Sequence, residues 1–190
     1  MIPFEKIRDS GEWTLFLDRD GVINKKLPGR YVTNWDEFEF IPKALEAIVS
    51  FSQIFKYIVI VTNQQGIGKE LMTDEDLQKV HARMIDEIMK KGGYIDQVYY
   101  CPYLAQEDPM CRKPNPGMAF QAAEDFDDIE FKKSIMIGDS LSDMQFGKQL
   151  GMYTILVNNS SNTQEYKEKD STIDQMLASL NEVATYLMFS

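Results

Sequence analysis

Two aspartates that lie one residue apart stand at the end of a short apolar run. The run Phe16-Leu17 leads directly into Asp18, and Asp20 is followed by a glycine. Because alternate residues of a strand share one face, we expect the two carboxylates to converge on one small volume. Two like charges so close are tolerated when a cation lies between them or when one carboxylate holds a proton. The pair therefore indicates a site for a hard metal such as magnesium, a nucleophile beside a general acid, or a solvated turn.

Further polar residues follow other apolar runs of the chain in the same way. They are Thr62 and Asn63 after the run 57–61, Arg112 and Lys113 after the run 98–101 and a loop, and Asp139 after the run 134–138. Runs rich in β-branched and aromatic residues, without polar alternation, are typical of strands buried in parallel sheets. Ligands bind at the carboxyl ends of such strands. We therefore expect these side chains to gather with the two aspartates at one edge of a sheet.

Helical patterns separate the apolar runs. Pro42 is favourable in the first turn of a helix, and Thr73 with Asp76 is typical of a helix start. The stretches that predict helices are 42–54, 73–91, 115–126 and 142–150. A further strand is expected at 153–157, and the chain closes with an amphipathic run at 176–187.

The alternation of strands and helices predicts the fold class. It favours right-handed crossovers and an α/β fold with a three-layer, doubly wound, mostly parallel sheet. At 190 residues, the chain has the size of one domain. We expect residues 1–190 to form that single domain, with the polar stretch 158–170 as a loop.

Composition limits the partners and the compartment. A formal net charge of -10 disfavours binding to a nucleic-acid backbone, whereas a small phosphate ester can bind where local cations overcome the field. No run approaches the ~20 apolar residues of a membrane span, and no apolar signal core opens the chain. Two cysteines are too few for a disulfide framework. We expect a cytoplasmic monomer that binds a small phosphorylated metabolite, with no nucleic-acid or membrane partner.

The order and spacing of the polar motifs resemble the four motifs of the haloacid dehalogenase superfamily of phosphatases. These motifs are Asp18-x-Asp20-Gly21, Thr62-Asn63, Lys113 before a proline, and Gly138-Asp139-x-x-x-Asp143. Within the superfamily, the segments 18–24, 29–32, 38–42, 61–64, 101–102 and 112–118 resemble the D-glycero-D-manno-heptose 1,7-bisphosphate phosphatase family. The histidinol-phosphatase domain shares much of this pattern, but the segments 31–42 and 115–118 favour the heptose enzyme. The resemblance implies a Rossmann-like fold, and the short distance from 21 to 42 leaves no room for a large cap domain.

The resemblance implies catalysis through an aspartyl-phosphate. Asp18 is then the nucleophile, and Asp20 protonates the leaving alcohol and later takes a proton from the hydrolytic water. Lys113 neutralises the phosphoryl oxygens. A phosphotransferase that uses the same intermediate is a lesser alternative.

The resemblance also implies a metal and a set of substrate contacts. Magnesium would be held by Asp18, the backbone carbonyl of Asp20, and Asp139, with Asp143 as a support or water-mediated ligand. The substrate contacts would come from Thr62 and Asn63, which donate hydrogen bonds to the phosphoryl group, and from Arg112, which holds a second anionic group. The expected substrate is heptose 1,7-bisphosphate at its 7-phosphate. The alternatives are histidinol phosphate as substrate and a non-catalytic phosphosugar-binding protein.

One loop departs from the resembled family, whose members commonly carry a Cys-x-His pair and a Cys-x-Cys pair that hold zinc. Here Tyr103 stands two residues after Cys101, and Pro109 stands two residues before Cys111. Because two thiolates alone rarely close a structural zinc site, we expect no zinc and a buried, apolar Cys101. The single histidine, His81, lies within a predicted helix and is expected to serve packing or the surface rather than catalysis.

Overall fold

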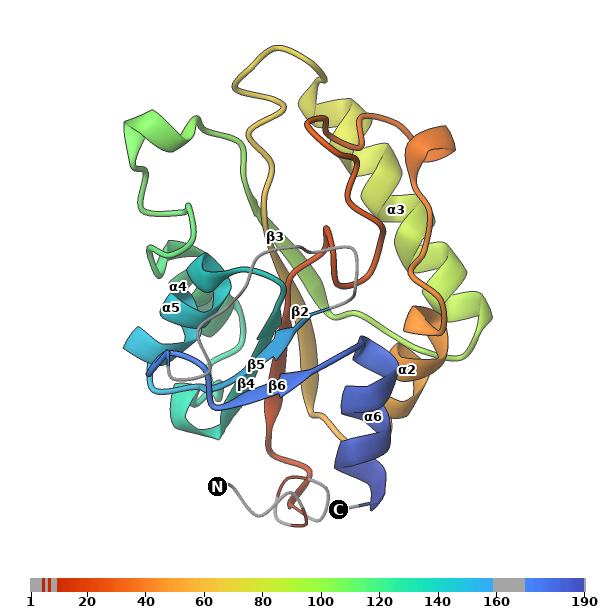
Figure 1. Ribbon diagram of the computed structural model, residues 1–190, viewed down its shortest axis with the longest axis vertical. Helices are drawn as coiled ribbons and strands as arrows, with labels where there is room; N and C mark the ends of the chain where they lie inside the picture. The colour runs from red at the N-terminus through yellow and green to blue at the C-terminus, as the bar shows by residue number, and fades with distance from the viewer. Residues whose placement is uncertain (1–4, 6, 8–9, 159–169, 190) are drawn as a thin grey trace.

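The computed structural model of the protein describes residues 5, 7, 10–158 and 170–189 (Figure 1). Most of the predicted loop 158–170 lies outside the described residues. A six-stranded sheet runs through the molecule in the order β3-β2-β1-β4-β5-β6, and every neighbouring pair is parallel. The strands are β1 (Thr14–Leu17), β2 (Tyr57–Asn63), β3 (Gln97–Cys101), β4 (Ser134–Gly138), β5 (Tyr153–Val157) and β6 (Gln175–Leu177). The strand order reverses at β1, which is the switch point where ligands bind in such sheets.

Helices cover both faces of the sheet, as the predicted three-layer α/β fold requires. The helices are α2 (Ala44–Phe51), α3 (Asp74–Lys90), α4 (Gly117–Asp125), α5 (Leu141–Gln149) and α6 (Leu180–Phe189), with short 3-10 turns η1 (Trp35–Glu37), η2 (Ala105–Glu107) and η3 (Phe131–Lys133). Helices α2, α3 and α6 lie on one side of the sheet, and α4 and α5 lie on the other (Figure 1).

The core consists of two apolar clusters, one on each face of the sheet. In β1, Leu15 and Leu17 belong to the cluster that includes α2, α3 and α6, whereas Phe16 belongs to the cluster that includes α4 and α5. All three side chains are fully buried. This burial explains why the strands are continuously apolar, because both faces of a parallel sheet are covered by helices.

Local side-chain and backbone conformations set the first residues of α3 and α2. Thr73 caps α3: its hydroxyl accepts the Asp76 N–H at 3.1 Å, and the Asp76 carboxylate accepts the Thr73 N–H at 3.1 Å. This capping box confirms the predicted start. Helix α2 begins at Ala44 rather than at Pro42, because Lys43 takes a left-handed backbone conformation with φ 65°.

Two further expectations were wrong. The run 176–187 is not one amphipathic element: its first part belongs to the edge strand β6, and only the part from Leu180 is helical. Cys101 is fully buried as expected, but it is not a free thiol, because its sulfur is bonded to that of Cys111, with 5.3 Å between the two Cα atoms. The disulfide encloses the loop 102–110.

The segment 21–43 between β1 and α2 forms a short flap rather than a cap domain. Its aromatic side chains pack on one another: the rings of Trp35 and Phe38 stack at 5.0 Å, and Phe40 lies edge-on to Phe38 at 5.0 Å. Backbone bridges link Asn24 to Asp20 and to Phe40, so the flap is tied to the end of β1. None of the described helices has the length and apolar character of a membrane span.

Candidate active site

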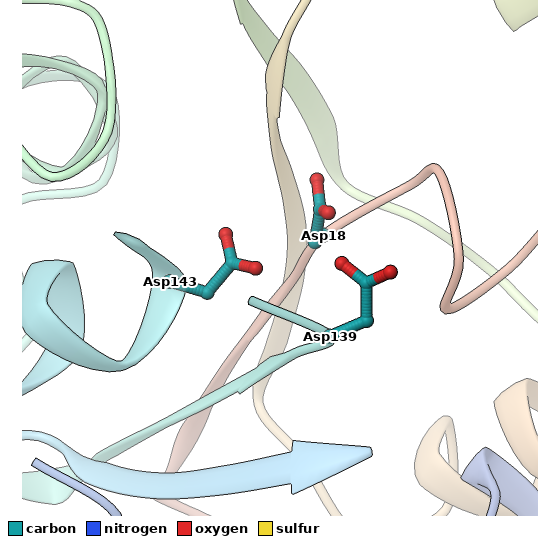
Figure 2. Close-up of side chains that lie close together, drawn as sticks. All are labelled: Asp18, Asp139 and Asp143. Atoms are coloured by element: carbon teal, nitrogen blue, oxygen red, sulfur yellow. The ribbon is translucent and has the colours of Figure 1, made fainter. Parts of the chain in front are cut away.

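Three buried carboxylates converge at the carboxyl edge of the sheet. Asp18 follows β1, Asp139 follows β4, and Asp143 lies in the first turn of α5 (Figure 2). One oxygen from each lies within 4.8 Å of the others, and the three residues are 6%, 1% and 1% exposed. The close-up shows all three carboxylates pointing into one shared space. Carboxylates from separate elements are thus brought together as the sequence predicted.

Two glycines make this close approach possible. A Cβ atom on Gly21 would lie 2.0 Å from an Asp139 oxygen, and Gly21 has a φ of +91° that side-chain-bearing residues rarely adopt. A Cβ atom on Gly138 would lie 2.2 Å from the Asp143 Cβ. The glycines of the two motifs therefore allow the carboxylates to occupy their observed positions.

Two lysine ammonium groups balance part of the negative charge. Lys113 Nζ donates to Asp18 at 2.8 Å and to the Val61 carbonyl at 2.7 Å, and it lies 2.6 Å from an Asp143 oxygen. Lys113 is only 3% exposed. Burial opposes its charge, yet the adjacent Asp143 and Asp18 carboxylates raise its pKa. Lys26, from the flap, places its ammonium 2.6 and 2.5 Å from the two Asp139 oxygens.

Burial makes the carboxylate cluster electrostatically unfavourable even with these lysines. Desolvation, followed by the neighbouring Asp18 charge, raises the pKa of Asp139 to about 7 although Lys26 opposes the rise. Desolvation also raises the pKa of Asp18, with Lys113 as the main opposing charge. The site therefore retains a demand for positive charge at neutral pH.

Asp20 lies in a different electrostatic environment. Its Oδ1 accepts from Asn24 Nδ2 at 2.9 Å, its Oδ2 accepts from Gln64 Nε2 at 2.8 Å, and Arg19 Nη2 donates to both oxygens at 2.9 Å. Burial works to raise the pKa of Asp20, but the Arg19 charge and these hydrogen bonds outweigh it and lower the pKa. Asp20 is therefore ionised at neutral pH in the free protein.

The last two residues of β2, Thr62 and Asn63, contact residues of the site. Thr62 is buried, and its hydroxyl accepts from Gln64 Nε2 at 2.9 Å. We expected Asn63 to donate a hydrogen bond to the phosphoryl group, but its side-chain amide is paired with the backbone of Lys113. Its amide nitrogen donates to the Lys113 carbonyl at 3.1 Å and its amide oxygen accepts the Lys113 N–H at 3.0 Å. Because both ends of the amide are paired, Asn63 fixes the backbone that carries Lys113.

Polar side chains from the flap and from the loop after β2 lie near Arg112, which directly precedes Lys113 in the chain, and we call this region the mouth of the site. The Tyr31 hydroxyl accepts from Gln65 Nε2 at 2.8 Å and from Lys69 Nζ at 2.9 Å. Arg112 Nη1 is buried and has no hydrogen-bond partner among the described residues. Burial lowers the pKa of Arg112, and the negative form of the nearby Tyr31 would raise it. The mouth thus presents donors and positive charge, whereas Trp35 packs within the flap.

The carboxylate cluster fits a bound magnesium ion. Oxygen atoms from Asp18, Asp139 and Asp143 are the ligand type that this hard cation prefers, and the raised pKa of Asp139 shows that the site favours added positive charge. The Lys26 ammonium lies 2.6 Å from an Asp139 oxygen, so these oxygens already bind one positively charged group. The side chain of Asp143 belongs to the cluster as closely as the other two.

Several site residues were not found from the sequence. Lys26, Asn24 and Gln64 reach the aspartates only through the folded flap and the loop after β2. Of these, Gln64 carried a usable signal, because it stands directly after a strand end in the Thr-Asn-Gln segment. The pairing of Arg19 with His81 also joins residues that are 62 positions apart.

The geometry of the fold and site agrees with comparisons to known proteins. A family profile described as HAD-hydrolase-like matches residues 110–183. A solved structure titled D,D-heptose 1,7-bisphosphate phosphatase from B. bronchiseptica, complexed with magnesium and phosphate, superposes with a TM-score of 0.84 and 30% identity over 93% of this chain and 98% of that chain. The fold and the site together define a hydrolase of the haloacid dehalogenase class, and its chemistry is that of a phosphatase.

Sequence comparison narrows the class to a family. The chain is 35% identical over 182 residues to D-glycero-beta-D-manno-heptose-1,7-bisphosphate 7-phosphatase of Vibrio cholerae, which covers 92% of this chain and 95% of the relative. It is 41% identical over 138 residues to D-glycero-alpha-D-manno-heptose-1,7-bisphosphate 7-phosphatase of Mycobacterium tuberculosis strain H37Rv, which covers 73% of each chain. The chain belongs to the heptose-1,7-bisphosphate 7-phosphatase family.

Proposed function

We propose that this protein removes the 7-phosphate of D-glycero-D-manno-heptose 1,7-bisphosphate in a magnesium-dependent reaction. The observation that carries the proposal is the convergence of Asp18, Asp139 and Asp143 beside the buried Lys113 ammonium. The kinship with named 7-phosphatases supports the choice of substrate. Residues 1–190 act as one domain in this proposal, and the protein works as a cytoplasmic monomer.

Asp18 is the proposed nucleophile. One of its carboxylate oxygens attacks phosphorus, the bond from phosphorus to the sugar oxygen breaks, and an aspartyl-phosphate forms. Lys113 donates to Asp18 at 2.8 Å, which orients the carboxylate and places a positive charge where phosphoryl oxygens arrive. Magnesium, held by Asp18, Asp139 and the Asp20 carbonyl and supported by Asp143, supplies further charge that screens the phosphoryl oxygens from the nucleophile.

Asp20 is the proposed acid and base. It donates a proton to the departing sugar oxygen, and it then takes a proton from the water that attacks the aspartyl-phosphate and releases inorganic phosphate. Arg19, together with hydrogen bonds from Asn24 and Gln64, keeps Asp20 ionised in the free protein. A phosphate dianion that binds beside this carboxylate raises its pKa and favours uptake of the proton that the first step requires. The Thr62 hydroxyl is the proposed donor to the phosphoryl group.

Arg112 is the proposed contact for the second phosphate of the substrate. Its buried Nη1 lacks a partner among the described residues, and a bound phosphate oxygen satisfies it by a charge-assisted hydrogen bond. Lys69 and Tyr31 lie at the same mouth and add one positive charge and one hydroxyl. The proposal places the reacting phosphate at Asp18 and the other phosphate at this mouth.

The proposal is tested by phosphate release with heptose 1,7-bisphosphate, prepared as both C1 anomers, and with p-nitrophenyl phosphate. Arg112→Ala should lower kcat/KM for the bisphosphate by about 10- to 100-fold, because a hydrogen bond to a charged group contributes ~1.5–3 kcal/mol. The same variant should leave kcat/KM for p-nitrophenyl phosphate nearly unchanged, since that substrate has no second phosphate. Arg30→Ala is the matched control, because Arg30 lies on the exposed flap and pairs with Glu37 at 3.8 Å. If Arg112→Ala lowers kcat/KM equally for both substrates, Arg112 does not bind the second phosphate.

A further inference from the structure

Arg19, which stands between Asp18 and Asp20 in the sequence, has a fully buried guanidinium that contacts Asp20 at one end and a histidine at the other. Arg19 is 0% exposed. Its Nη2 donates to both Asp20 oxygens at 2.9 Å, and its Nη1 lies 3.0 Å from His81 Nε2 in the middle of α3. Its Nε has no hydrogen-bond partner among the described residues. The orientation of this guanidinium therefore depends on the carboxylate at one end and the imidazole at the other.

The contact fixes the protonation state of the imidazole. A guanidinium has only donors, so His81 Nε2 must be the acceptor and the ring proton must lie on Nδ1. Burial, followed by the Arg19 charge, lowers the pKa of His81 to about 3, which agrees with a neutral ring. His81 is 6% exposed, and its ring meets Tyr100 edge-on at 6.0 Å. A packing role alone does not require a polar ring with this tautomer.

We propose that His81 is a positioning residue that acts through Arg19 to aim the Asp20 carboxylate. The imidazole accepts one Arg19 N–H, so the planar guanidinium is held with Nη2 directed at both Asp20 oxygens. This inference rests on the proposed role of Asp20 as acid and base. It replaces the expectation that His81 serves only packing or the surface.

The contribution of His81 should be partial. Asn24 and Gln64 also donate to Asp20, at 2.9 and 2.8 Å, and they do not involve the guanidinium. Loss of the imidazole acceptor leaves a buried charged donor without a partner and lets the guanidinium rotate. Partners of this indirect kind typically change activity by about 10- to 100-fold, and we expect about a tenfold loss because two other donors remain.

The leaving group reveals whether the loss acts through Asp20. An alkyl phosphate such as heptose 1,7-bisphosphate requires protonation of its leaving oxygen, whereas p-nitrophenolate departs without a proton. Because hydrolysis of the aspartyl-phosphate is common to both substrates, the comparison uses kcat/KM, which reports only the steps up to departure of the leaving group. His81→Leu should lower kcat/KM about tenfold for the alkyl substrate and less than about threefold for p-nitrophenyl phosphate. His81→Gln should restore most of the loss, since its amide oxygen can accept from Arg19. The packing control is Ile88→Val, two helical turns further along α3, which should not alter the ratio of the two kcat/KM values.

The outcomes separate this inference from the proposed function. Equal losses on both substrates in His81→Leu, or a His81→Gln variant as impaired as His81→Leu, would overturn the positioning role. If instead Asp20→Asn lowers kcat/KM by the same factor for alkyl and aryl phosphates, the assignment of Asp20 as the acid fails. A further measurement needs no variant, because the chain has one histidine. Nitrogen-15 NMR of the wild-type imidazole should show the proton on Nδ1, and a proton on Nε2 would overturn the inference even if a variant fails to fold.

Discussion

Replacement of Asp139 by asparagine should make the metal-free protein more stable while it removes activity. Asp139 is buried beside two other carboxylates, and desolvation raises its pKa from 3.8 to about 7. Between pH 3.8 and about pH 7, Asp139 holds a proton in the folded state but has released it in the unfolded state. The free energy of unfolding of the wild type therefore falls as pH rises from about 4 to about 7, and above that range the full cost of the buried charge remains.

The size of this effect follows from the two pKa values. A rise from 3.8 to about 7 corresponds to about 4 kcal/mol at ~1.4 kcal/mol per pH unit. This value already includes the opposing effect of Lys26, whose side chain is 47% exposed and can turn to water once Asp139 is neutral. The asparagine side chain of the variant does not titrate, so the stability advantage of Asp139→Asn should grow by up to about 4 kcal/mol between pH 4 and pH 8. At pH 8 this advantage corresponds to a Tm increase on the order of 10 °C.

The assay is thermal unfolding in a chelator across this pH range, followed by the same series with magnesium. Magnesium should stabilise the wild type more strongly as pH rises, and it should stabilise Asp139→Asn less. The variant should also lose at least about 100-fold in kcat/KM, because the metal contributes several kcal/mol to catalysis. A variant that is less stable than the wild type at pH 8 in chelator, with the same pH dependence, would refute the electrostatic account of the cluster.

Three further predictions concern the nucleophile, the buried lysine and the cysteine loop. Asp18→Asn should abolish phosphate release while circular dichroism shows an unchanged fold, and near wild-type turnover would exclude Asp18 as the nucleophile. Lys113→Met should lower the free energy of unfolding by about 3–5 kcal/mol, because it leaves the buried carboxylates of Asp18 and Asp143 without their paired ammonium. An unchanged midpoint of urea unfolding would contradict this prediction. Elemental analysis should find no stoichiometric zinc, since the Cys101 and Cys111 sulfurs are bonded to each other; about one zinc per chain would show that other ligands exist.

The main features of the fold followed from local sequence patterns. Continuous apolar runs predicted buried parallel strands, and Thr73 predicted the start of α3 through a capping box that forms within four residues. The start of α2 was placed too early, because the left-handed conformation of Lys43 has no clear sequence signal. The strand β6 was missed because it has three residues and depends on its pairing with β5.

The gathering of Asp18, Lys113 and Asp139 followed from their places after strands, because parallel strands end at a common edge. The remaining contacts depend on tertiary structure. The bond between Cys101 and Cys111 depends on how the loop between them folds, and the two ends of the Asn63 amide meet a backbone 50 residues away. Lys26 likewise reaches Asp139 across 113 positions, a separation over which side-chain pairing leaves no local pattern.

In the proposed reaction, Asp18 of the carboxylate cluster attacks the 7-phosphate of heptose 1,7-bisphosphate, which is released as inorganic phosphate. Phosphorus-31 NMR of the reaction with magnesium tests it most directly, with kcat/KM measured in parallel for histidinol phosphate. We predict one equivalent of inorganic phosphate, a heptose 1-phosphate product, and a kcat/KM for the bisphosphate well above that for histidinol phosphate. Release of the 1-phosphate, or a higher kcat/KM for histidinol phosphate, would contradict the proposed substrate.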